Sequence, residues 1–221
     1  MEYIVVALMF VVFLQTRIMD LRRAVYCLGV QSAIIAAACL VIGMSHGGGL
    51  HAFLPGVLTI AVKVIFIPYA ILKVVRNLQD ETEIVSDINV NYSTAVAACA
   101  LGLSYMVFDS LLPHYEGRDI LASSLFMIMT GLILIVMRSR AIMQMIGLIT
   151  LENGIYLFGL ITLENGIYLF GLVMTEGLPI IIELGVFLDV LIAVVILVIL
   201  TSRLRVSFKT TDTNQLTKLK G

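Results

Sequence analysis

The sequence predicts an all-α fold: a polytopic transmembrane helix bundle of about seven spans, with the N-terminus outside and the C-terminus cytoplasmic. Three features predict it, namely a high hydrophobic content, apolar runs of bilayer length and an uneven distribution of Lys and Arg. Of the 221 residues, 60% are hydrophobic and 13% are charged, which is more apolar surface than a soluble domain of this size can cover. We therefore expect a multi-pass protein of the cell inner (plasma) membrane that contacts lipid and no nucleic acid.

Seven apolar runs are candidate spans, each close to the roughly 20 residues that a bilayer requires, except the longer sixth. They cover residues 2–18, 25–44, 51–74, 92–112, 120–137, 141–174 and 178–200. No basic segment precedes the first run, so we expect it to remain as a helix and not to be removed as a signal peptide. The chain reads as a single membrane domain, in which four N-terminal helices (1–112) precede a three-helix unit (119–201) and a cytoplasmic tail (202–221).

Lys and Arg give the predicted orientation, because they collect in cytoplasmic connections. Of the 14 basic residues, 12 lie in or beside the first, third and fifth connections or in the tail. These are Arg17, Arg22, Arg23, Lys73, Arg76, Arg138, Arg140, Arg203, Arg205, Lys209, Lys218 and Lys220. The opposite connections hold only Arg118, and Lys63 lies within a span. The N-terminus is therefore predicted to lie outside.

Carboxylates interrupt the last two spans. Glu152, Glu164, Glu183 and Asp189 all have apolar neighbours, and an acid at the centre of a transmembrane helix costs roughly 2.5–3.5 kcal/mol. Such acids usually serve an ion or proton path and face protein or trapped water. Hydrogen bonding to a neighbouring helix is the alternative, and it has more weight for Glu183 near the outer end of its span than for Asp189 near the middle.

The sixth span contains a perfect duplication, in which GLITLENGIYLF at 147–158 recurs at 159–170. Twelve helical residues rise roughly 18 Å and leave Glu152 and Glu164 about 120° apart around the helix. A single helix over 141–174 would be roughly 50 Å long, whereas the hydrocarbon core is roughly 30 Å thick. We interpret one copy as an insertion, either recent or an artefact of sequencing, with one Glu at functional depth. Which copy that is stays open.

Lys63 lies about midway along the third span, roughly 17 Å from either end, which is too far for its side chain to reach the interface. It is either a titrating relay group or a lysine held permanently by a buried carboxylate. Pro68, five residues on, removes a backbone donor and crowds the carbonyl of Val64, so a kink there could admit water. Asn153 and Asn165 follow the two LENG glutamates and are suited to bridging helices.

Four segments carry a resemblance to a known family: AVKVIFIP around Lys63, LENGIYLF, IELGVFLDVLIAVVI and the closing TNQLTKLKG. Over nearly its whole length the chain resembles the E subunit of hydrogenase-4-type (formate hydrogenlyase-like) energy-converting NiFe hydrogenases. From residue 120 to the tail it further resembles the three-helix K subunit of complex I and the C subunit of Mrp-type antiporters. Asp189 resembles the third-helix acid of the K subunit. The match on the sixth span is looser, because the K subunit places its acid four residues before the Asn and the family has one LENG motif.

The resemblance implies a membrane-arm subunit between quinone-site-like and antiporter-like subunits. Proton or Na⁺ translocation there would be coupled to hydrogen metabolism in the soluble NiFe and iron–sulfur subunits. The chain has no CxxC pair, phosphate loop, nucleophile triad or paired His ligands, so we expect no catalytic residue, metal or cofactor in it. The expected relay consists of Lys63, a LENG glutamate, Asp189 and, with less weight, Glu183.

Three alternatives stay open. The first is a subunit of an Mrp-like cation/proton antiporter assembly, and the second is a structural scaffold whose charges only lock helix packing. The third, a stand-alone solute carrier, is disfavoured because the sequence lacks two matching halves with broken helices.

The charge asymmetry yields a first prediction. In intact cells, a membrane-impermeant thiol reagent should label cysteines placed at 47–49 and 114–117, because these connections lack the basic residues of cytoplasmic ones. It should not label a cysteine at Thr210 in the tail. Labelling at Thr210 would reverse the orientation.

Overall fold

A computed structural model describes residues 2–45, 56–57, 59–76, 90–115 and 117–164, and every element in these segments is a helix. The predicted all-α class is confirmed for this part of the chain. The elements are α1 (Glu2–Arg17), α2 (Leu21–Ser45), the π-helix η1 (Ile60–Phe66), α4 (Ile67–Val75), α5 (Val90–Leu111), α6 (Arg118–Met137) and α7 (Ala141–Glu164).

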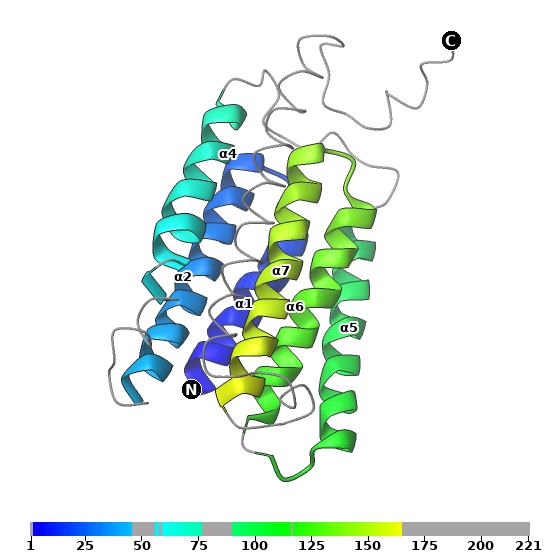
Figure 1. The fold of residues 1–221 in the computed structure, drawn as a ribbon. Helices are drawn as coiled ribbons and strands as arrows, with labels where there is room; N and C mark the ends of the chain where they lie inside the picture. The colour runs from blue at the N-terminus through cyan, green and yellow to red at the C-terminus, as the bar shows by residue number, and fades with distance from the viewer. Residues whose placement is uncertain (1, 46–55, 58, 77–89, 116, 165–221) are drawn as a thin grey trace, which may run out of the picture.

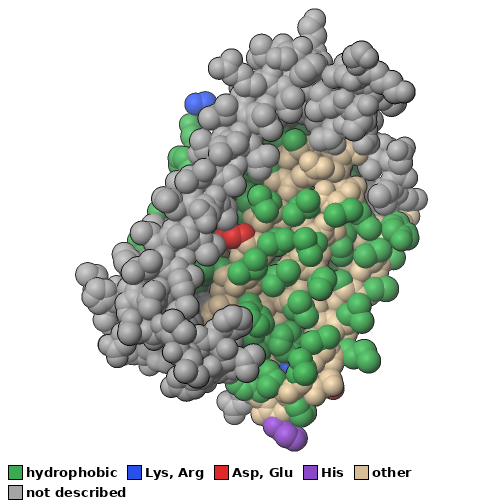
Figure 2. All heavy atoms as spheres, turned by 45° about the vertical axis from the view of Figure 1, so that its right-hand side comes forward, with side chains coloured by type: hydrophobic (Ala, Val, Ile, Leu, Met, Phe, Trp, Pro, Cys, Tyr) green, Lys and Arg blue, Asp and Glu red, His purple; other side chains and the backbone are tan. Residues whose placement is uncertain are grey.

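Four stretches are long and apolar enough to cross a membrane: Leu21–Val41, Asn91–Leu111, Arg118–Met137 and Ala141–Gly159. Helix α1 is apolar but shorter. Large apolar side chains point outward from these helices, and Figure 2 shows such side chains over much of the face in view. This outer surface is compatible with lipid contact. Seven spans and their orientation stay predictions, and the predicted seventh span, 178–200, lies outside the described residues.

A three-residue connection joins α1 to α2, so the two helices are antiparallel neighbours. Asp20 caps α2, because its Oδ1 accepts hydrogen bonds from the backbone amides of Arg22 (2.9 Å) and Arg23 (3.1 Å). These bonds satisfy donors that the first turn of a helix leaves unpaired. The cap explains why α2 begins at Leu21, before the predicted start at Val25.

Glycines allow α6 and α7 to pack closely. A Cβ added at Gly131 would lie 2.6 Å from the backbone nitrogen of Leu151. One added at Gly154, in the first LENG motif, would lie 2.9 Å from the carbonyl oxygen of Ser124. Small residues at helix interfaces are how membrane helices bring their backbones together. The short 138–140 link and these contacts fix the register of α7 against α6.

The core has two large apolar clusters, one toward each end of the bundle, besides a small one between α5 and α6. The first joins α2, α4 and α7, and the second joins α1, α2, α5, α6 and α7. Figure 1 shows α7 between α2 and α6, with α4 beside α2 and α5 beside α6, in agreement with the helix contacts. Val62 of η1 packs against both clusters. Lys63, the next residue, therefore lies where the two clusters meet.

The glycine contacts yield a second prediction. Gly131→Ala should lower the free energy of unfolding by roughly 1–3 kcal/mol, because the new methyl group meets backbone atoms of α7 that have nowhere to move. Thermal unfolding of the purified protein in detergent would measure the change.

The matched control is Gly102→Ala in α5, where no heavy atom lies within 4 Å of the added Cβ. It should leave stability unchanged or slightly higher, since Ala is the better helix former. Equal effects of the two substitutions would contradict the packing account.

Candidate functional site

A π-helix positions Lys63. In η1 the backbone is wound more widely than in an α-helix, and the amide of Ile67 donates to the carbonyl of Val62, five residues back. Pro68 follows at the start of α4, where it has no amide to donate, and it packs against Gly29 of α2. From Pro68 we expected that a kink beside Lys63 could form; the structure has a π-helical turn there, a feature at which helices often kink. Such turns occur frequently at functional sites.

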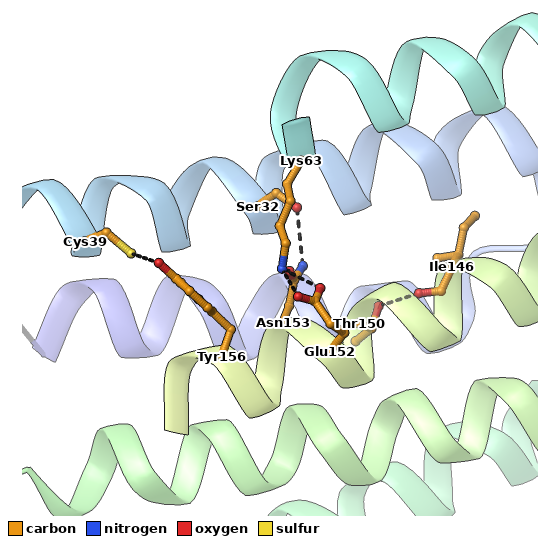
Figure 3. A network of polar contacts seen from close by, with 8 residues as sticks. All are labelled: Ser32, Cys39, Lys63, Ile146, Thr150, Glu152, Asn153 and Tyr156. Carbon is orange, nitrogen blue, oxygen red and sulfur yellow. Dashed lines mark hydrogen bonds and ion pairs between the residues drawn. The ribbon is translucent and has the colours of Figure 1, made fainter. Parts of the chain in front are cut away.

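Lys63 forms an ion pair with Glu152 of α7 inside the bundle. Its ammonium group contacts both carboxylate oxygens of Glu152. It also donates a hydrogen bond of 2.9 Å to Oδ1 of Asn153 (Figure 3). The Lys63 side chain is 1% exposed and that of Glu152 is 6% exposed. Two charged groups thus share one buried position, although 89 residues separate them in the chain.

Side chains from α2 and α7 complete the network around the pair. Nδ2 of Asn153 donates to Oγ of Ser32 on α2 at 3.3 Å. The ring of Tyr156, one turn after Glu152, has its centroid 5.1 Å from the Lys63 Nζ, which is within the range of a cation–π interaction. The Tyr156 hydroxyl accepts a hydrogen bond of 3.4 Å from Sγ of Cys39 on α2. An ion pair, hydrogen bonds and a cation–π contact therefore hold the lysine and its surroundings in place.

The depth of the pair explains why it needs this network. Glu152 lies eleven residues after Ala141, the first residue of α7, which is roughly 17 Å along a helix, about half of a hydrocarbon core roughly 30 Å thick. A charged group buried at this position cannot replace a lost partner by contacts with bulk water. Removing one partner of a buried ion pair typically costs roughly 3–5 kcal/mol, because the other charge is left uncompensated.

The structure places the first LENG copy against Lys63. Glu164 is the last residue of α7 as described, twelve residues beyond Glu152 and therefore roughly 18 Å further along the helix. Of the other predicted site residues, Asn165, Glu183 and Asp189 lie outside the described part of the chain. The structure thus brings together Lys63, Glu152 and Asn153, with Pro68 one turn away.

Sequence reasoning missed several members of the site. Ser32 and Tyr156 were not singled out, and neither were three buried polar residues close to the network, Gln15, Gln31 and Thr150. A signal for the glutamines was present, because an uncharged amide inside an apolar span is also costly to bury. Tyr156 gave none, since aromatic residues are common in apolar helices and only the fold brings its ring to Lys63.

Comparison with known proteins yields a distant relative. The uncharacterized protein Rv0085 of Mycobacterium tuberculosis is 27% identical over 205 residues, which cover 91% of this chain and 87% of the relative. No family model matches the chain, and no solved structure matches it. The similarity extends over nearly the whole chain, and the relative's name states no activity.

The buried pair yields a third prediction. Lys63→Met should lower the free energy of unfolding by roughly 3–5 kcal/mol, because the Glu152 carboxylate loses its ammonium partner. The double variant Lys63→Met/Glu152→Met should recover most of that loss, since it leaves no charge behind. The amount of folded protein in the membrane and its unfolding in detergent would report both effects.

The exposed ion pair between Arg118 and Asp109 provides the control, because the Asp109 side chain is 69% exposed. Asp109→Asn should cost no more than roughly 1 kcal/mol, as for other surface pairs. If the double variant were no more stable than Lys63→Met, the two side chains would not be energetically coupled.

Proposed function

We propose that this chain is a membrane subunit of a hydrogenase-4-type energy-converting NiFe hydrogenase, in which the Lys63–Glu152 pair is a proton relay. The observation that carries the relay is the pair itself: two titratable groups of opposite charge, on different helices, in contact at mid-depth of the bundle. Ionisable residues inside a membrane bundle mark ion and proton pathways in most cases. The family assignment rests on the sequence resemblance around Lys63, the LENG motif and the C-terminal helices.

The pair is suited to passing protons because it can change charge in two ways. A proton can be added to the Glu152 carboxylate, or one can leave the Lys63 ammonium group. Either step leaves one net charge in a buried place, where electrostatic interactions are much stronger than in water. That charge attracts or repels the next proton, so the pair couples successive transfers.

Asn153 and Tyr156 hold the pair while it titrates. The Asn153 carbonyl oxygen accepts from Lys63, and its amide donates to Ser32. When Glu152 becomes protonated, Asn153 and the Tyr156 ring still stabilise the ammonium group. The lysine therefore keeps partners in both states of the carboxylate.

The remaining parts of the proposal come from the sequence. Seven spans, an external N-terminus and a cytoplasmic tail would place Asp189, and with less weight Glu183, on the last helix as further relay groups. Antiporter-like and quinone-site-like subunits would lie on either side in the plasma membrane. The translocated ion would be H⁺ or Na⁺, and the redox centres would belong to the soluble subunits.

A second candidate is a scaffold, and one observation favours it. Lys63 is held by Glu152, Asn153 and the ring of Tyr156 together, which is the environment expected of a fixed pair. In that case the pair would only specify how η1 docks on α7, a role documented for some buried polar groups.

Glu152→Gln separates the two candidates and gives the fourth prediction. The amide keeps the volume of the side chain and offers Lys63 a carbonyl oxygen, so the complex should assemble. In inverted vesicles, hydrogen turnover with an artificial electron carrier should continue, while proton uptake coupled to the physiological reaction should fall by about tenfold or more, as for loss of a proton-transfer group.

The second LENG copy supplies the matched control. Glu164→Gln makes the same chemical change twelve residues away and should leave coupled proton uptake intact. Normal pumping by an assembled Glu152→Gln complex would reject the relay and support the scaffold. Asp189→Asn, measured in the same way, tests the predicted relay group on the last helix.

A further inference from the structure

Polar contacts lead away from the ion pair toward the 138–140 link. Thr150, two residues before Glu152 on α7, donates a hydrogen bond of 3.2 Å to Oε1 of Gln15 on α1, and Thr150 and Gln15 are both fully buried. The next residue of α1, Thr16, accepts a hydrogen bond at its backbone carbonyl from the Arg138 guanidinium group. The contacts therefore run from the link, through the last turn of α1, to the turn of α7 that carries Glu152.

Thr150 occupies the position from which a proton could move to the pair. It lies three residues before Asn153, and residues at this spacing share a face of a helix. Its hydroxyl has two acceptors, Oε1 of Gln15 and the carbonyl oxygen of Ile146 at 2.9 Å, but only one hydrogen to give. A hydroxyl group can both donate and accept a hydrogen bond, so it can pass a proton along a chain of hydrogen bonds.

Two buried amides, Gln31 on α2 and Gln15 on α1, have unused hydrogen-bonding capacity. Gln31, adjacent to Ser32 on α2, is fully buried, and within the described part of the chain neither its Oε1 nor its Nε2 has a partner. The same holds for Nε2 of Gln15. Buried polar groups are nearly always hydrogen-bonded, and internal water supplies the bonds that the protein does not. These amides therefore point to bound water.

We propose that water held by Gln15, Gln31 and Thr150 forms a one-sided proton route from the 138–140 link to the Lys63–Glu152 pair. The proposal rests on the relay function proposed above and adds the side from which the relay is supplied. Each step breaks one O–H bond and forms another, so a proton that enters at the link leaves the last water for the Glu152 carboxylate.

The opposite side of the pair differs in character. There Tyr156 and Cys39 are bonded to each other and packed in an apolar cluster with Phe126 and Leu157. The buried amides with unused hydrogen-bonding capacity, Gln15 and Gln31, lie outside this cluster.

Silver ions test the route independently of activity, because Ag⁺ is small and reaches a thiol only through water. Cysteines would be placed singly at Gln15, Gln31 and Thr150 in a full-length chain whose three native cysteines are replaced by alanine, within the assembled complex in membrane vesicles and chloride-free buffer. Protection from later alkylation measures the reaction. Arg23→Cys marks the link side and His114→Cys the opposite side, since both residues are exposed.

The matched controls are Leu28→Cys on α2 and Ile146→Cys on α7, which are as buried as the test positions but apolar. Silver added from the link side should react about tenfold or more faster at the three polar positions than at these controls, because apolar surroundings exclude aqueous ions. Equal rates at polar and apolar positions, or faster reaction from the opposite side, would overturn the route.

Thr150→Val tests whether the route delivers protons. It keeps the shape of the side chain and removes the hydroxyl, so coupled proton uptake should fall by about tenfold, and Thr150→Ser should restore it. Ser104→Ala is the control, since that hydroxyl bonds only to the Ala100 carbonyl in its own helix, α5. Equal uptake by the Val and Ser variants would count against delivery through Thr150.

The two proposals can fail separately. If Glu152→Gln abolishes coupling while Ag⁺ rates are uniform and Thr150→Val pumps normally, the relay stands and the route is rejected. If Ag⁺ reacts selectively but Glu152→Gln pumps normally, the hydrated route is supported and the relay function is rejected.

Discussion

The structure depends on one constraint: a lysine and a glutamate at mid-depth of an apolar bundle must stay in contact. Both side chains lie inside the bundle, 1% and 6% exposed, so each charge needs the other as its partner. The π-helical turn carries Lys63 toward α7, where Glu152 meets it. Close glycine packing of α6 on α7 holds the partner helix at a fixed distance and register. The backbone features around the site therefore serve to place two charges within contact distance.

The position of Glu152 along the bundle is set by the number of residues between it and the start of α7, as well as by packing. Helix α7 starts directly after a three-residue link, and that link is anchored because Arg138 binds the end of α1. With its start fixed, α7 brings Glu152 of the first LENG copy to the level of Lys63. The identical second motif has the same chemistry, but twelve residues of helix would move its Glu roughly 18 Å along the axis and about 120° around it.

Hydrophobic content and the length of the apolar runs were sufficient to predict the fold class. Lys63 and Glu152 could each be recognised in the sequence as a charged residue within an apolar run. Their pairing could not be predicted, because 89 residues separate them and several acids competed for the lysine. The π-helix was missed because a proline signals a disturbed backbone without saying whether it bends or widens. Ser32 and Tyr156 carried no signal, since their role exists only after η1, α2 and α7 have docked. Asn165, Glu183 and Asp189 lie outside the described residues, so their parts in the site stay predictions.

The two residues of the ion pair lie far apart in the chain, so Lys63 is synthesised well before Glu152. Lys63 is made 89 residues before Glu152, an interval of roughly 4–18 s at translation rates of about 5–20 residues per second. During that time Lys63 lacks the carboxylate that it contacts in the folded protein. We expect the early helices to remain beside the insertion machinery, with the lysine in contact with protein or water, until α7 arrives. The ion pair can therefore form only after α7 has been synthesised, so the late arrival of Glu152 sets when η1 can dock on α7.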